Sequence, residues 1–188
     1  GSLEATGLVD NGGVIRLRAS HAISNTGTIT ANAAPGSAGQ GGNITAIADL
    51  ANPESRITVD GNWRALGGDL GGDGGFIDTS GSRLTIAETA SVSTAAPQGT
   101  AGTWLIDPND YTIAASGGQL TGAQLGALLS TSNVTLEISE LSGGPEIVAA
   151  RAAERSFHEV IVLGYRNAMS ETDADARTLL TLIAFNQV

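Results

Sequence analysis

Three aspartates in a glycine-rich run are the residues whose types and spacing could form a metal site. The run extends from Leu66 to Asp78. Carboxylates set between glycine turns can supply the oxygen ligands that Ca²⁺ prefers. Asp73 follows Asp69 by four residues and Asp78 follows Asp73 by five, but no second copy of the run completes a ligand shell. Asp69, Asp73 and Asp78 are therefore calcium candidates, although a solvated loop explains them as well. No other metal ligand and no cofactor is predicted.

A pair of carboxylates could also carry glycoside hydrolysis, which needs two acids about 5 to 10 Å apart beside a sugar groove. Asp60, Asp107 and Asp110 fall at predicted turns, where hydrogen bonds to the backbone explain them. Asp78 and Glu88 stand near strand ends without an evident partner. We therefore predict no catalytic residue and no enzyme, with a β-helical carbohydrate-active enzyme as an alternative.

The histidines and tryptophans form no recognisable site. His21 and His158 match no metal-ligand spacing. Trp63 and Trp104 are expected to cover apolar surface of the fold, although an exposed Trp63 beside Arg64 would suggest sugar binding.

The composition of the 188 residues narrows the class of protein. Gly accounts for 26 residues and aromatic residues for 4 %, while 41 % are hydrophobic, so the core must consist mainly of small aliphatic side chains. The 9 basic residues are all Arg and face 19 acidic ones, giving a net charge of −10. Such a chain is not expected to bind nucleic acid or an anionic membrane. It has no cysteine and no apolar stretch long enough to span a membrane.

An irregular repeat organises the first 140 residues. The phrases Gly12-Gly13-Val14-Ile15, Gly41-Gly42-Asn43-Ile44 and Gly74-Gly75-Phe76-Ile77 are followed by a looser copy, Gly102-Thr103-Trp104-Leu105. Alternating apolar residues after each glycine pair predict strands, and further short strands are expected at 22–23, 27–31, 56–59, 84–86 and 91–94. Loops are expected to bulge at 35–42 and 66–75.

Two topologies suit short strands with tight corners: an antiparallel sandwich and a parallel β-helix. The β-helix explains more, because stacked coils select aliphatic residues inside and tolerate loops of variable length. We predict an all-β, right-handed parallel β-helix of roughly six coils, with about 20 residues in each.

Residues 102–136 contain two phrases that point to a family. The first is Gly102-Thr103-Trp104-Leu105-Ile106-Asp107-Pro108-Asn109-Asp110-Tyr111-Thr112-Ile113, and the second runs from Leu120 to Leu136. Together they resemble filamentous haemagglutinin-like exoproteins of bacterial two-partner secretion. With the glycine repeats, the resemblance covers about residues 5–137. It implies a secreted or surface-exposed adhesin with a right-handed parallel β-helix, exported through an outer-membrane transporter barrel.

The end of the chain reads differently. Thr121 can cap a short helix whose apolar face is Leu125, Leu128 and Leu129. A strand is expected at 111–113 and another at 134–138. Residues 141–188 are predicted to form a helical tail, which is either a cap on the last coil or an extension foreign to the fold.

The sequence thus predicts a β-helical segment at 1–140 and a helical tail at 141–188, in a chain that is part of a longer protein. The expected function is that of a shaft in a secreted bacterial surface adhesin, which presents loops for attachment to a cell-surface receptor or glycan. A calcium- or glycan-binding module is a further alternative.

Overall fold

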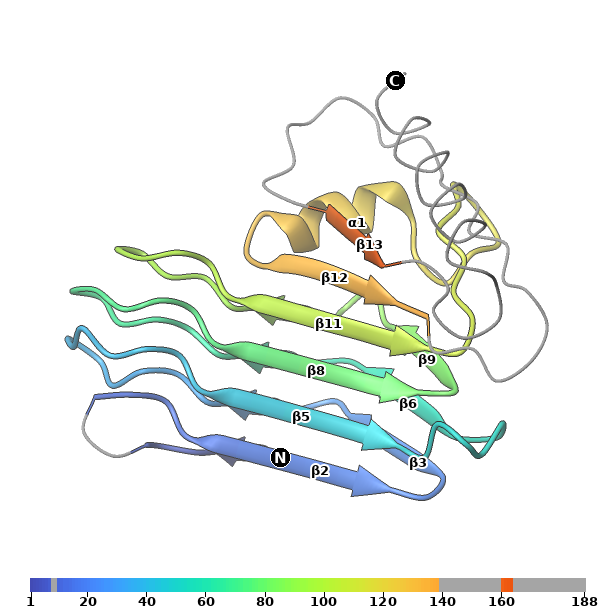
Figure 1. Ribbon diagram of the computed structural model, residues 1–188, viewed down its shortest axis with the longest axis horizontal. Coiled ribbons are helices and arrows are strands. Elements are labelled where there is room, and N and C mark those ends of the chain that lie inside the picture. Colours follow the sequence, from blue (N-terminus) through green and yellow to red (C-terminus); the bar gives the residue numbers. More distant parts are fainter. Residues whose placement is uncertain (8–9, 139–159, 164–188) are drawn as a thin grey trace.

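The computed structural model describes residues 1–7, 10–138 and 160–163 (Figure 1). The strands wind into a parallel β-solenoid of about five turns. All pairings between named strands of the described residues are parallel. This excludes the antiparallel sandwich and confirms the predicted parallel β-helix.

Three sheets form the faces of the solenoid, and each complete coil contributes one strand to each sheet. The long sheet has the order β13 (Val160–Leu163), β12 (Asn133–Glu137), β11 (Thr103–Pro108), β8 (Phe76–Gly81), β5 (Asn43–Ala48) and β2 (Val14–Ala19). The second has the order β1 (Ser2–Glu4), β4 (Thr28–Thr30), β7 (Asn62–Arg64) and β10 (Ser91–Ser93). The third has the order β3 (Ala22–Asn25), β6 (Arg56–Val59) and β9 (Arg83–Ile86).

A ladder of inward-facing side chains runs through the long sheet. Register pairs Ile15 with Ile44, Ile44 with Ile77, Ile77 with Trp104 and Trp104 with Val134. All five side chains are buried. Burying a large aliphatic side chain stabilises a fold by about 1.5–3 kcal/mol, so this ladder is a main source of cohesion between coils.

The repeat unit found in the sequence is one whole coil. Backbone N–H groups of Asn43, Phe76 and Thr103 donate to the carbonyl oxygens of Gly13, Gly42 and Gly75, respectively, one coil back. One coil therefore takes 27 to 33 residues, and the estimate of six coils of about 20 residues was wrong. Each coil is longer than expected because it holds three strands and a protruding loop.

The predicted loops at 35–42 and 66–75 are confirmed, and a third loop at 95–102 lies beside them. All three precede strands of the long sheet and stack on one another (Figure 1). We call residues 33–42, 66–75 and 95–102 the loop stack. A Cβ atom at Gly72 would overlap the carbonyl oxygen of Gly39, and one at Gly99 would overlap that of Gly72. Glycine is therefore required for the close approach of the stacked backbones.

Two strand predictions failed for local reasons. Residues 62–64 were assigned to a loop but form β7, which pairs with β4 and β10. Conversely, 111–113 is not a strand, and only Ile113 forms a bridge, with Leu120. The segment bonds to itself instead: the Thr112 N–H donates to Gln119 Oε1 and the Gln119 N–H donates to the Thr112 carbonyl.

The predicted short helix is confirmed as α1 (Gly122–Leu129). Thr121 is its N-cap and forms a capping box with Gln124, while Leu125, Leu128 and Leu129 are buried. No helix of the described residues is long and apolar enough to cross a membrane.

The predicted helical tail is described only at 160–163, where the chain forms a strand rather than a helix. This strand, β13, pairs in parallel with β12 at the end of the long sheet. An unpaired strand edge favours the addition of another strand, which accounts for extended structure at this point. The rest of 141–188 lies outside the described residues, as does the boundary predicted at 140.

Candidate functional site

Two rows of side chains cross the outer face of the long sheet, because residues i and i+2 of a strand point to the same side. The first row consists of Arg16, Thr45, Asp78, Leu105 and Thr135. The second consists of Arg18, Ile47, Ser80, Asp107 and Glu137. The rows bring together charged residues from four coils that are far apart in the sequence.

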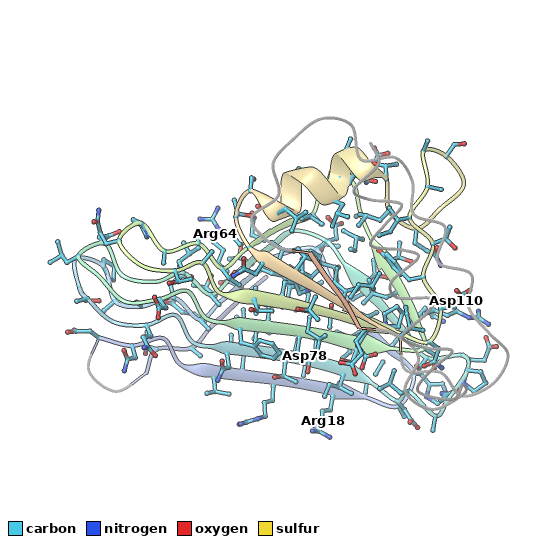
Figure 2. The ribbon with its side chains drawn as sticks, turned by 45° about the horizontal axis from the view of Figure 1, so that its top comes forward. Arg18, Arg64, Asp78 and Asp110 are labelled. Atoms are coloured by element: carbon cyan, nitrogen blue, oxygen red, sulfur yellow. The ribbon has the colours of Figure 1, made fainter. Side chains whose placement is uncertain are left out.

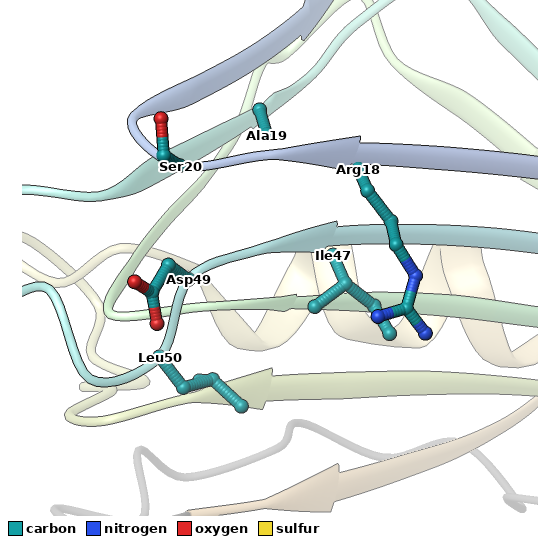
Figure 3. Close-up of a pocket in the computed structure, with 6 residues that line it drawn as sticks. All are labelled: Arg18, Ala19, Ser20, Ile47, Asp49 and Leu50. Carbon is teal, nitrogen blue, oxygen red and sulfur yellow. The ribbon is translucent and has the colours of Figure 1, made fainter.

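A groove of about 390 Å³ opens at the end of these rows, where β2 and β5 run into their corner turns. Its lining residues are Arg18, Ala19, Ser20, Ile47, Asp49 and Leu50 (Figure 3). The Asp49 carboxylate accepts a hydrogen bond from the Ala51 N–H at 3.0 Å, which fixes the turn after β5. The Ser20 hydroxyl lies 2.9 Å from Nδ1 of His21. The corner turns therefore hold the polar groups of the groove in place.

Arg18 is the one cation in the groove lining. Its side chain extends from β2 across Ile47 of β5 (Figure 3). The guanidinium makes no hydrogen bond or ion pair with any residue that the structure describes. Its charge acts on Asp78, which lies two coils further along the sheet. The donors of Arg18 are thus available to a ligand.

Asp78 is partly buried in the outer face of β8. Burial raises the pKa of its carboxyl, and the nearby charge of Glu137 acts in the same direction. The Ser80 hydroxyl, which donates to Asp78 Oδ1 at 2.5 Å, and the charge of Arg18 both lower this pKa. Figure 2 shows Arg18 and Asp78 on strands of the long sheet, whereas Arg64 lies on β7 and Asp110 in the turn after β11.

Two further acids lie side by side on this face. Asp107 and Glu137 directly follow the register pair Ile106 and Leu136 on adjacent strands. Neighbouring strands are about 4.8 Å apart, so their backbones are close enough for the carboxylates to act on one ligand. Asp107 was assigned to a turn and Glu137 was not singled out. Counting positions from the equivalent glycines of each coil would have placed both residues on the outer face.

The three calcium candidates have separate positions. Asp69 Oδ2 accepts from the Gly36 N–H at 3.0 Å, in the preceding coil. Asp73 Oδ1 accepts from the Thr100 N–H at 2.8 Å, in the following coil. Asp78 lies on β8, outside the loop stack. Asp69 and Asp73 therefore join neighbouring coils, and no group of three or more His, Asp or Glu residues suited to a metal ion occurs in the described part of the chain.

The aromatic residues are structural, as predicted. Trp63 and Trp104 are fully buried, which removes the sugar-binding role considered for an exposed Trp63. The Trp63 Nε1 donates to the Asp60 carbonyl at 3.0 Å. His21 contacts the adjacent Ser20, and His158 lies outside the described residues.

Comparisons with family models, curated proteins and solved structures find no significant match to this chain.

Proposed function

We propose that this chain is a shaft segment of a secreted bacterial surface adhesin, resembling the exoproteins of two-partner secretion. The observation that carries the proposal is the in-register stacking of consecutive coils along one axis. Each coil buries its aliphatic ladder against its neighbours, so an extended surface is built by repeating one unit. The loop stack and the outer sheet faces are then available for attachment.

The residues of the family-like phrases have structural positions that support this proposal. Trp104 and Ile106 face inward on β11, and Tyr111 and Leu120 are buried in the coil that follows. The second phrase supplies the capped helix α1 and strand β12. A phrase whose residues stack a coil and turn into the next is expected in a shaft.

Export can be tested with an antibody against this chain in the bacterium that encodes it. The antigen is expected on the cell surface or in the medium, and to disappear from both when the partner outer-membrane barrel is deleted. Restoring the barrel should restore export, and a periplasmic marker controls for lysis. Antigen that stays inside the cell, or that is exported without the barrel, would contradict the proposal.

The neighbouring carboxylates Asp107 and Glu137 favour one alternative of another class, a carbohydrate-active enzyme. Glycosidases use two carboxylates that act on one glycosidic bond. A screen on polysaccharides, with Asp107→Asn and Glu137→Gln as test variants and Asp110→Asn as a control for the lost charge, separates the two functions. Cleavage that both test variants abolish would replace the shaft proposal as the main function, whereas the shaft proposal predicts no cleavage.

A further inference from the structure

We infer that the groove between the ends of β2 and β5 binds a neutral sugar unit, with Arg18 and Asp49 as its hydrogen-bonding residues. The inference does not depend on the shaft function, because it concerns a ligand of the solenoid surface itself.

Unused hydrogen-bonding capacity is the first observation. A guanidinium has five N–H donors, and that of Arg18 has no hydrogen-bond partner in the described part of the chain. On the other wall Asp49 is exposed, and the described residues give its carboxylate a single hydrogen bond, from the Ala51 N–H. A fork of donors and a free acceptor oxygen therefore line one groove, an arrangement suited to the hydroxyls of a sugar.

The apolar part of the groove is the second observation. Ala19, Ile47 and Leu50 supply aliphatic surface between the two charged groups (Figure 3). A pyranose ring has an apolar C–H face and an edge of hydroxyls that both donate and accept. Its C–H face can contact Ile47 and Leu50 while its hydroxyls reach Arg18 and Asp49.

The charge of the groove selects against ionic ligands. Phosphate or sulfate would meet one arginine beside Asp49, in a protein of net charge −10. A polyamine would meet the guanidinium of Arg18. A neutral ligand that carries both donors and acceptors avoids both repulsions. The volume of about 390 Å³ lies near the lower end of the roughly 300–1,000 Å³ typical of small-molecule sites, which suits a mono- or disaccharide.

The test is a ¹H–¹⁵N NMR titration of the full chain with glucose, galactose, mannose and their disaccharides. Glucuronic acid, glucosamine and inorganic phosphate are titrated separately as charged probes. We expect saturable shifts at residues 18–20 and 47–50 with a neutral sugar, and a dissociation constant of about 1 mM, because the groove is open and offers few contacts.

Two variants and one matched control decide the assignment. Arg18→Gln and Asp49→Asn should each weaken binding about tenfold, since each removes a charge-assisted hydrogen bond. Arg16→Gln removes the same charge two residues earlier on the same face of β2, outside the groove lining, and should leave affinity within about twofold. Unchanged far-UV circular dichroism verifies folding of each variant.

Three results would overturn the inference. The first is the absence of saturable shifts with every neutral sugar. The second is tighter binding of phosphate, glucuronic acid or glucosamine than of any neutral sugar. The third is sugar binding that Arg18→Gln and Asp49→Asn leave unchanged.

Discussion

The indole Nε1 of Trp104 donates a hydrogen bond of 3.0 Å to the hydroxyl of Thr79, which lies one coil back in the solenoid. That hydroxyl in turn donates to the Leu105 carbonyl at 3.1 Å. Both side chains are fully buried, so one hydroxyl satisfies a donor and an acceptor that water cannot reach. This small network joins β8 to β11 inside the core.

Replacing Thr79 with Val should therefore destabilise the protein by about 1–3 kcal/mol, because the indole N–H is left unsatisfied in the core. Thr79→Ser keeps the hydroxyl and should cost less, about 1 kcal/mol for the lost methyl group. Urea unfolding measures both. In a Trp104→Phe background, Thr79→Val should cost less than in the parent chain, and equal costs in the two backgrounds would contradict the network.

Asp78→Asn should stabilise the protein at pH 7. Burial raises the pKa of the folded-state carboxyl above its value in the unfolded chain, so the folded state holds this proton more tightly. The contribution of Asp78 to stability therefore falls as pH rises through that interval. The amide avoids this loss and can still accept from Ser80.

The gain from Asp78→Asn should shrink to nothing below about pH 4, where the unfolded-state carboxyl is also protonated. Urea unfolding at pH 7 and at pH 3.5 measures this change. Asp110→Asn removes the same formal charge from an exposed turn and should show no such dependence. A gain from Asp78→Asn that is equal at both pH values would count against desolvation as its cause.

Tyr111→Phe should stabilise the protein by about 1 kcal/mol. The Tyr111 hydroxyl is buried, and no hydrogen-bond partner for it exists among the described residues. Burial also raises the pKa of this phenol, so the hydroxyl remains neutral through the ordinary range of tyrosine titration. Thermal unfolding of the two proteins provides the comparison, and a loss of stability in the variant would show that the hydroxyl is satisfied after all.

Gly75→Ala should destabilise the solenoid by about 1–3 kcal/mol, because its Cβ atom would overlap the carbonyl oxygen of Gly42 in the coil below. Gly126→Ala is the matched control. Its Cβ atom meets nothing within 4 Å, and alanine favours the helix by about 1 kcal/mol. Opposite shifts in melting temperature are expected, and similar shifts would mean that the backbones of adjacent coils separate easily.

The sequence was sufficient to predict strands, loops and coil stacking wherever local chemistry repeats. Glycine pairs followed by alternating aliphatic residues predicted β2, β5 and β8, and the capping box of Thr121 and Gln124 predicted α1. These features depend on neighbouring residues, so they could be recognised without knowing which segments meet.

Register between coils was harder to predict, because it depends on contacts between distant segments. The fourth repeat was aligned with Gly102 opposite Gly74, but the structure pairs Thr103 with Phe76, so Gly102 stands opposite Gly75. A shift of one residue exchanges the two faces of a strand. The correct register turns Trp104 inward and Asp107 outward, which explains why the carboxylate row was missed.

The Arg18 groove could not be inferred from sequence for a similar reason. Its two walls lie 29 or more residues apart between Arg18 or Ser20 and Asp49, and neither wall carries a motif. The Asp69 and Asp73 pattern attracted attention because it is local, yet each side chain bonds to a different neighbouring coil.

The equivalence of Gly13, Gly42 and Gly75 has a consequence for how such a molecule can change length. Excising 43–75, from one equivalent point to the next, would bring Phe76 to the position that Asn43 holds above Gly13. The cut ends would meet without a change of direction, and the mismatch would be limited to side chains at the new junction. Duplications and losses of whole turns are thus the gentlest edits available to this architecture, whereas removing part of a turn would rotate everything beyond it.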